Sequence, residues 1–145
     1  MYKIIQFPIH GDKSGNLIAL EKGRDFPFDI KRVYYIWGTK HDAIRGKHGH
    51  RILQQVIICT SGSCDFILDN GKERATVHLN NPTEGLYIYS AVWREFTNFS
   101  HDCVLMVLAD NYYSKDDYIT SYDEFIKEFG IHSQKKEDNR TVVYS

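Results

Sequence analysis

Two histidines separated by a single residue lie in residues 45–50, with the sequence RGKHGH. Strand side chains alternate between the two faces, so on a strand His48 and His50 would point to the same side. Imidazole moves protons readily near neutral pH and is also a common metal ligand. The spacing therefore predicts either an acid–base site or half of a metal site, whereas a pair of surface histidines on an edge strand would give the same pattern.

Cations and amides accompany the pair. Arg45 precedes it and could hold a phosphate or stabilise an oxyanion, and Arg32 and Arg94 could do the same unless they are surface charges. Gln54 shares the parity of the histidines and would face inward with them if no bulge intervenes. The apolar run after Gln55 predicts that the next strand is buried in a core.

Residues 46–62 contain, in order, a glycine, the H-x-H pair, an amide four residues on, a predicted strand and another glycine. This order resembles the first motif of the cupin barrel. Cupins that bind a metal add a carboxylate and a third histidine to this pair. Here Gln54 or Gln55 stands at the carboxylate position and Arg94 at the position of the last histidine. An arginine cannot ligate a cation and would repel it. We therefore predict a site without metal or other cofactor.

The composition predicts one ordinary globular domain. The chain has 145 residues, of which 42% are apolar and 26% charged, and its net charge of −1 predicts no broad affinity for nucleic acid or for anionic membranes. The N-terminus lacks the apolar region of a signal peptide, and no apolar run is long enough to span a membrane. Cys59, Cys64 and Cys103 are an odd number of thiols, which predicts buried free cysteines and a cytoplasmic protein.

The pattern of short strands between turns predicts an all-β fold, a sandwich or barrel of jelly-roll type. The expected strands are 2–7, 16–20, 30–37, the histidine strand, 55–60, 63–68, 74–79, 86–89, 92–99 and 103–109. Asn70-Gly71 suits a type I′ hairpin turn. Helical spacing of apolar residues predicts a short C-terminal helix over 116–129. We expect a single domain over 1–132 and a polar tail over 133–145.

Several segments together resemble the sugar-nucleotide 3,4-ketoisomerases of the cupin superfamily. They include 31–36 (KRVYYI), 45–50 (RGKHGH), 91–93 (AVW) and 117–119 (DYI), and the likeness extends over residues 2–129. The resemblance implies a cupin jelly-roll barrel and metal-independent isomerisation of a dTDP-linked 4-keto-6-deoxyglucose. It also implies a homodimer, often with exchanged N-terminal strands, that serves deoxy-aminosugar synthesis for lipopolysaccharide, S-layer glycan or antibiotics.

The resemblance also implies roles for the residues of the predicted site. His50 would be the base, His48 a proton donor or base partner, and Tyr35 a hydrogen-bonding group or acid. Arg45 would stabilise the enediolate or bind the sugar. The expected substrate-binding residues are Arg94, Trp93, Arg32 and Gln54.

Three positions depart from the pattern of these isomerases. The family pattern has glutamate at Gln54, histidine at Arg94 and arginine at Ser14. Two other functions therefore stay open, a nucleotide-sugar 3,5-epimerase and a non-catalytic cupin that binds sugars.

Overall fold

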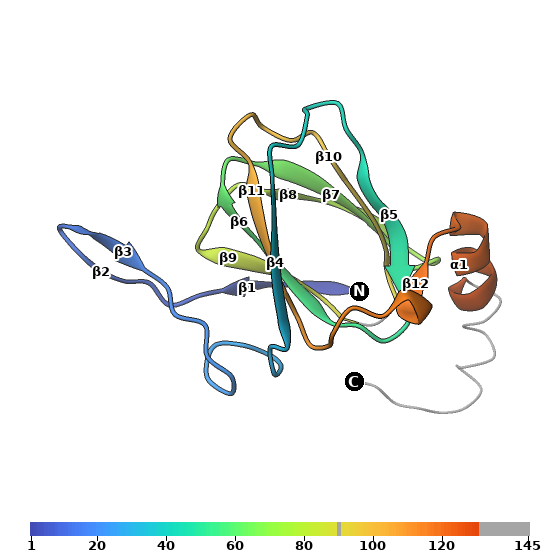
Figure 1. Cartoon of the computed structure of the whole chain (residues 1–145), viewed down its shortest axis with the longest axis horizontal. Helices are drawn as coiled ribbons and strands as arrows, with labels where there is room; N and C mark the ends of the chain where they lie inside the picture. The colour runs from blue at the N-terminus through green and yellow to red at the C-terminus, as the bar shows by residue number, and fades with distance from the viewer. Residues whose placement is uncertain (90, 131–145) are drawn as a thin grey trace.

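A computed structural model describes residues 1–89 and 91–130, which form two facing five-stranded antiparallel sheets (Figure 1). The first sheet has the order β1 (Tyr2–Gln6), β9 (Glu84–Ile88), β6 (Gln55–Ser61), β11 (Val104–Ala109) and β4 (Arg32–Trp37). The second has the order β12 (Tyr118–Ile119), β5 (Arg45–His50), β10 (Trp93–Thr97), β7 (Cys64–Asp69) and β8 (Arg74–Leu79). The predicted tail over 133–145 lies outside the described residues.

The main core lies between the two sheets and confirms the predicted all-β jelly roll. It combines inward side chains of both sheets, such as Ile57 and Leu105 from the first with Phe66 and Leu68 from the second. Strands that alternate apolar and polar residues bury one face against this core, which fixes their register. The three cysteines are free and buried, as predicted, and burial raises the pKa of the Cys59 thiol to about 12.

The predicted hairpin at Asn70-Gly71 forms, but with a longer loop than a type I′ turn. Asp69 pairs with Arg74, so residues 70–73 form the connection between β7 and β8. Gly71 has a positive φ of 84°, and the side chain of Asn70 accepts hydrogen bonds from the backbone N–H groups of Lys72 and Glu73. The side-chain bonds of Asn70 therefore stabilise a four-residue loop instead of the two-residue turn.

A bulge in β5 decides which of its side chains enter the barrel. Arg94 of β10 pairs with His48 and Glu95 pairs with Gly46, so Lys47 is an extra residue in β5. Gly46 and Lys47 accommodate the bulge with φ values of 81° and 53°. One inserted residue shifts the alternation by one, and as a result Arg45 reaches the same face of the sheet as His48.

The segment expected to be one helix is divided into three elements. Residues Lys115–Asp117 form a 3₁₀ turn (η1), β12 pairs with β5, and the helix α1 spans only Tyr122–Phe129. Ser121 caps α1 by accepting a hydrogen bond from the N–H of Glu124. The helical spacing of residues 116–119 was misleading because pairing of Tyr118 with His50 supplies their backbone hydrogen bonds instead. Within the described residues, no helix is long and apolar enough to cross a membrane.

Helix α1 packs on the outer face of β5 next to β12 (Figure 1). A Cβ at Gly49 would lie 2.9 Å from the ring of Phe125, so the glycine between the two histidines gives the helix room. Phe125 is fully buried with Trp93 and Ile119 in a small cluster under α1. The same strand therefore carries the helix on one face and the histidines on the other.

We expect Gly46→Ala to destabilise the protein more than Gly38→Ala. Both glycines have positive φ values, 81° and 67°, but a Cβ at Gly46 would lie 2.6 Å from the Phe96 ring, whereas Gly38 has nothing within 4 Å. Strain alone should cost ~1 kcal/mol at Gly38, and the clash should add about 1–3 kcal/mol at Gly46. Urea unfolding of both variants measures the difference, and equal losses of stability would show that the bulge is not tightly packed.

Candidate active site

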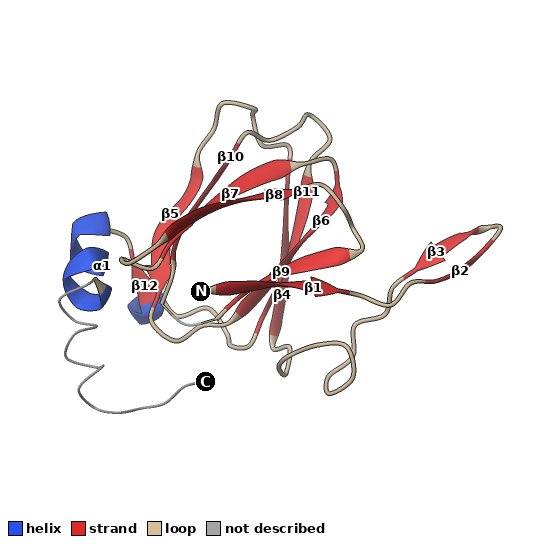
Figure 2. Cartoon of the chain, turned by 180° about the vertical axis from the view of Figure 1, so that it is seen from behind, coloured by secondary structure: helices blue, strands red, loops and turns tan. Residues whose placement is uncertain are grey.

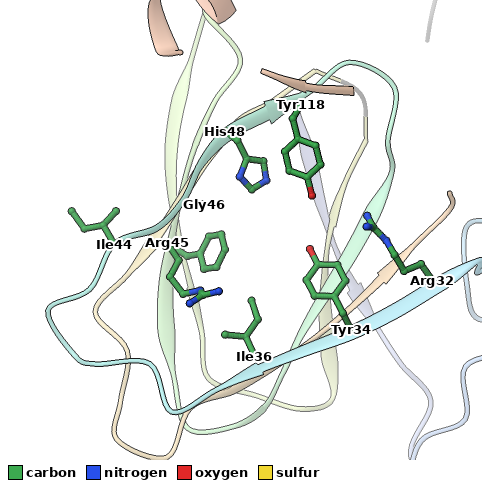
Figure 3. A pocket seen from close by; sticks show the side chains of 9 residues that line it. Arg32, Tyr34, Ile36, Ile44, Arg45, Gly46, His48 and Tyr118 are labelled. Atoms are coloured by element: carbon green, nitrogen blue, oxygen red, sulfur yellow. The ribbon is translucent and has the colours of Figure 1, made fainter. Parts of the chain in front are cut away.

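A cleft of about 600 Å³ opens between β4 of one sheet and β5 with β12 of the other (Figure 3). The lining residues are Arg32, Tyr34, Ile36, Ile44, Arg45, Gly46, His48, Phe96 and Tyr118. None of these nine side chains is a carboxylate. The cleft is therefore positively charged and suited to an anionic ligand.

The alternation of β4 sends Tyr34, and not Tyr35, into this cleft. Arg32, Tyr34 and Ile36 are partly buried on the inner face, whereas Tyr35 is 64% exposed on the outer face. In Figure 3 the Tyr34 side chain projects from β4 toward Tyr118 on the opposite wall. The structure thus places Tyr35 outside the cleft and brings its neighbour into the position that the sequence analysis gave to Tyr35.

The two histidines occupy different depths. His48 lines the cleft, while His50 is completely buried and does not line it. The His50 ring lies 4.9 Å from the His48 ring and 4.4 Å from the Tyr118 ring, between centroids. Both histidines are brought together as predicted, but only His48 can touch a ligand directly without rearrangement.

Tyr118 is a lining residue that sequence reasoning missed. It falls within the helix that the sequence predicts over 116–129, whereas β12 places it opposite His50 and 5.0 Å from the His48 ring. The available signal was its position in the segment 117–119, which is part of the family resemblance. Figure 3 shows the hydroxyl groups of Tyr118 and Tyr34 pointing toward one another across the cleft.

Burial keeps both imidazoles neutral. Desolvation, and then the positive charge of Arg94, lowers the pKa of His48 to about 4, although a hydrogen bond with the backbone of Gly46 acts in the opposite direction. The pKa of His50 is also lowered, by burial first and then by Arg94 and His48, against the raising effect of Asp117. At neutral pH both rings are therefore able to accept a proton.

Arg94 lies behind the cleft and is 2% exposed. Its Nη1 donates to Gln55 Oε1 at 2.5 Å and its Nη2 to the carbonyl of Val92 at 2.9 Å, while its Nε has no hydrogen-bond partner among the described residues. Gln55 in turn donates to the Tyr34 hydroxyl at 3.1 Å. No carboxylate pairs directly with this guanidinium in the described part of the chain, and burial lowers its pKa to about 10.

Gln54 and Trp93 do not line the cleft. The chain bends at residues 51–52 and β6 starts at Gln55, so Gln55 takes the inward position, and Gln54 accepts a hydrogen bond from Tyr87 on the outside. The bend breaks the strict alternation that had placed Gln54 inward. Trp93 points away from Arg94 on β10 and is buried beneath α1 beside Phe125.

The two remaining arginines do lie at the cleft. Arg45 is an exposed residue at its rim, and Arg32 stacks over the Tyr34 and Tyr113 rings at 5.3 and 5.9 Å. The Nε of Arg32 is buried and has no partner within the described residues. Over residues 1–89 and 91–130, no group of three or more histidine, cysteine, aspartate or glutamate side chains is arranged to hold a metal ion.

The whole described chain matches a known protein family, whose description is "FdtA: WxcM-like, C-terminal", over residues 1–130. The TDP-4-oxo-6-deoxy-alpha-D-glucose-3,4-oxoisomerase of Aneurinibacillus thermoaerophilus is 49% identical over 125 residues, which are 86% of this chain and 90% of that protein. A 3,4-ketoisomerase structure from Helicobacter canadensis is 46% identical, with a TM-score of 0.84 and coverage of 87% of this chain and 95% of that one.

A third relative has been solved with a sugar nucleotide bound. It is a histidine-to-asparagine variant of the 3,4-ketoisomerase QdtA from Thermoanaerobacterium thermosaccharolyticum, in complex with TDP-4-keto-6-deoxyglucose. Its sequence is 45% identical and its TM-score is 0.86, with coverage of 88% of this chain and 93% of that one.

Because Gln55 and Arg94 share a buried hydrogen bond, we expect substitutions at the two positions to change the free energy of unfolding non-additively. Gln55→Leu leaves a buried charged N–H unpaired and should cost about 1–3 kcal/mol of unfolding free energy. Adding Arg94→Met removes that charge, and the double variant should regain at least half of the loss, because replacing buried ions by apolar groups is often neutral. Denaturant unfolding of the two single variants and the double variant gives the coupling energy, and strictly additive losses would contradict it.

Proposed function

The chain belongs to the FdtA family (WxcM-like, C-terminal), and from this we propose that it is a 3,4-ketoisomerase that moves the carbonyl of a TDP-linked 4-keto-6-deoxyglucose from C4 to C3. The observation that carries the proposal is a neutral histidine, His48, in a cleft lined by arginine and tyrosine without a carboxylate. Such a cleft attracts a nucleoside diphosphate and provides a base that is not already protonated.

The reaction needs only proton transfers. The C3 proton is acidic because it is next to the C4 ketone, and a base removes it while O4 gains a proton, which gives an enediol across C3 and C4. O3 then loses its proton and C4 gains one, which leaves a ketone at C3 and a hydroxyl at C4. The oxidation of C3 is balanced by the reduction of C4, so no external oxidant or reductant takes part.

We assign the role of base at carbon to His48, because it lines the cleft while His50 lies behind it. The hydroxyl groups of Tyr34 and Tyr118 are the candidates for moving protons at the sugar oxygens, and Tyr34 replaces Tyr35 in this role. General acid–base catalysis of this kind contributes ~10²–10⁴-fold to a rate. His50 then supports His48 from the interior.

Three arginines supply positive charge at the cleft and behind it. Arg45 and Arg32 face the space where a diphosphate or a developing enediolate would lie. Arg94 acts from behind, through Gln55 and Tyr34, as a fixed positive charge. A divalent metal beside the two histidines would be repelled by this charge, and we therefore propose that the reaction is metal-independent.

The product suggests a place in metabolism. A ketone at C3 of a nucleotide sugar is a substrate for transamination, so we propose that the chain supplies an aminotransferase in the synthesis of a 3-amino-deoxysugar. Three free, buried thiols suit a reducing compartment, which supports the cytoplasm as the site of the reaction.

We also propose that the chain forms a homodimer through the outer face of β4. Val33, Tyr35 and Trp37 are 53%, 64% and 68% exposed on this face, and the last two rings lie 5.7 Å apart. β4 is an edge strand of its sheet, and the hairpin of β2 (His10–Asp12) and β3 (Gly15–Leu17) projects well away from the barrel (Figure 2). An exposed aromatic face and a projecting arm are the features needed for an exchange of N-terminal strands between two copies.

His48→Asn should reduce kcat by at least about 10²-fold, because it removes the base while keeping the shape and the polarity of the side chain. Proton NMR of TDP-4-keto-6-deoxyglucose with the protein, in the presence of a chelator and in D₂O, measures turnover and the carbon that gains deuterium. Exchange at C3 and C4 supports the isomerase, whereas exchange at C5 indicates the epimerase. Tight TDP-sugar binding without any exchange would indicate a non-catalytic protein, and full activity of the variant would remove His48 from the reaction.

Trp37→Asp should convert the dimer to a monomer, because it places a charge in the proposed aromatic interface. Ile52→Asp is the matched control, since Ile52 is similarly exposed, at 71%, but lies outside β4. Sedimentation velocity of the parent and of both variants measures the oligomeric state. A monomeric parent, or a Trp37 variant that stays dimeric, would disprove this interface.

A further inference from the structure

The carboxylate of Asp117 contacts the His50 ring and can only accept hydrogen bonds. Its Oδ2 lies 2.9 Å from Nδ1 of His50. Its Oδ1 accepts the backbone N–H groups of Arg51 at 3.1 Å and Ile52 at 2.9 Å. The carboxylate is therefore fixed by three hydrogen bonds, and its side chain is only 11% exposed.

The surrounding chain holds this carboxylate in place. The Arg51 guanidinium donates to the carbonyl of Asp116 at 2.8 Å and to the carboxylate of Glu128 at 3.0 and 3.2 Å. It thus ties the 3₁₀ turn that carries Asp117 to β5 and to helix α1. Asp117 cannot turn away from His50 without breaking the bend that follows β5.

This geometry determines the tautomer of His50. A carboxylate only accepts hydrogen bonds, so the hydrogen of the neutral imidazole must be on Nδ1. The other ring nitrogen, Nε2, then carries a lone pair, and it is buried without a hydrogen-bond partner in the described residues. The ring that carries it packs against His48 and Tyr118, which both line the cleft.

We propose that Asp117 is a positioning residue that keeps His50 in the Nδ1–H tautomer, so that Nε2 is held ready as a proton acceptor directly behind the cleft. This inference rests on the proposed isomerase function. The proton that His48 removes from the sugar passes on to Nε2 of the adjacent His50 ring during the first half of the reaction and returns by the same route during the second half. The Asp117 carboxylate stabilises the imidazolium that exists between these two transfers, and no proton is gained or lost overall.

Asp117→Asn tests the proposal with little change of shape. The backbone N–H group of Ile52 requires an oxygen at the Oδ1 position, and an NH₂ group there would also face the N–H group of Arg51, so the new amide must turn its NH₂ group toward His50. That group donates to Nδ1, and the hydrogen of His50 is then forced onto Nε2. The substitution therefore inverts the tautomer and removes the acceptor.

Glu128→Gln is the matched control. It weakens the two hydrogen bonds between the Arg51 guanidinium and Glu128, and it therefore also lowers the stability of the segment after β5. It leaves the hydrogen bond between Asp117 and His50 intact. A merely structural role of Asp117 predicts that the two variants behave alike. A positioning role predicts that only Asp117→Asn changes the histidine tautomer.

The experiment combines two readouts. Nitrogen-15 NMR of histidine-labelled protein, with His50→Asn as the assignment control, should show hydrogen on Nδ1 of His50 in the parent and in Glu128→Gln, and on Nε2 in Asp117→Asn. In the NMR turnover assay, Asp117→Asn should lose about 10²-fold or more in kcat with less change in KM, and Glu128→Gln should stay near the parent.

Each outcome decides one of the two proposals. An unchanged tautomer in Asp117→Asn, or an unchanged kcat with an inverted tautomer, overturns the positioning role. A parent that shows the Nδ1–H tautomer but no isomerisation rejects the proposed function, while the inversion in the variant still establishes that Asp117 controls the His50 tautomer.

Discussion

Strand β5 must pack against helix α1 with one face and line the cleft with the other, and the site depends on this constraint. Its outer face has to accept Phe125 of α1, which only a glycine at position 49 allows without displacement. Its inner face has to present Arg45 together with His48, which an uninterrupted strand could not do because the two residues differ in parity. The bulge at Gly46 and Lys47 resolves the conflict by inserting one residue.

Two opposite charges, on Arg94 and Asp117, act on His50 and define the electrostatics of the site. Arg94 lowers the pKa of this imidazole, while Asp117 raises it and binds its Nδ1. Because the barrel interior excludes water, these charges are weakly screened and act over the width of the site. The result is a pair of neutral histidines that are able to accept a proton, beside a fixed cation that would stabilise a developing enediolate.

Local patterns in the sequence were sufficient for most of the fold and for part of the site. Alternating apolar residues and turn signals located every strand of the two five-stranded sheets except β12, because burial of one face fixes strand register over five or six residues. The RGKHGH segment identified His48 and His50 as neighbours on one face, since a single residue separates them. The replacement of the cupin acid by an amide and of the last histidine by Arg94 was also visible in the sequence, but the alternation of strand residues assigned the inward amide to Gln54 instead of Gln55.

The tertiary structure alone decided which neighbour of each ambiguous pair enters the cleft. Gln55 displaces Gln54 because the bend at residues 51–52 resets the alternation, and Tyr34 displaces Tyr35 because the pairing of β4 with β11 turns the face that carries Tyr34 inward. Asp117 and Tyr118 reach His50 across 67 and 68 positions of sequence through the pairing of β12 with β5, in a segment whose own spacing favours a helix. The periodicity of a sequence predicts which residues share a face of one strand or helix. Contacts between distant elements depend instead on which strands pair, and the free energy of the whole fold determines that pairing.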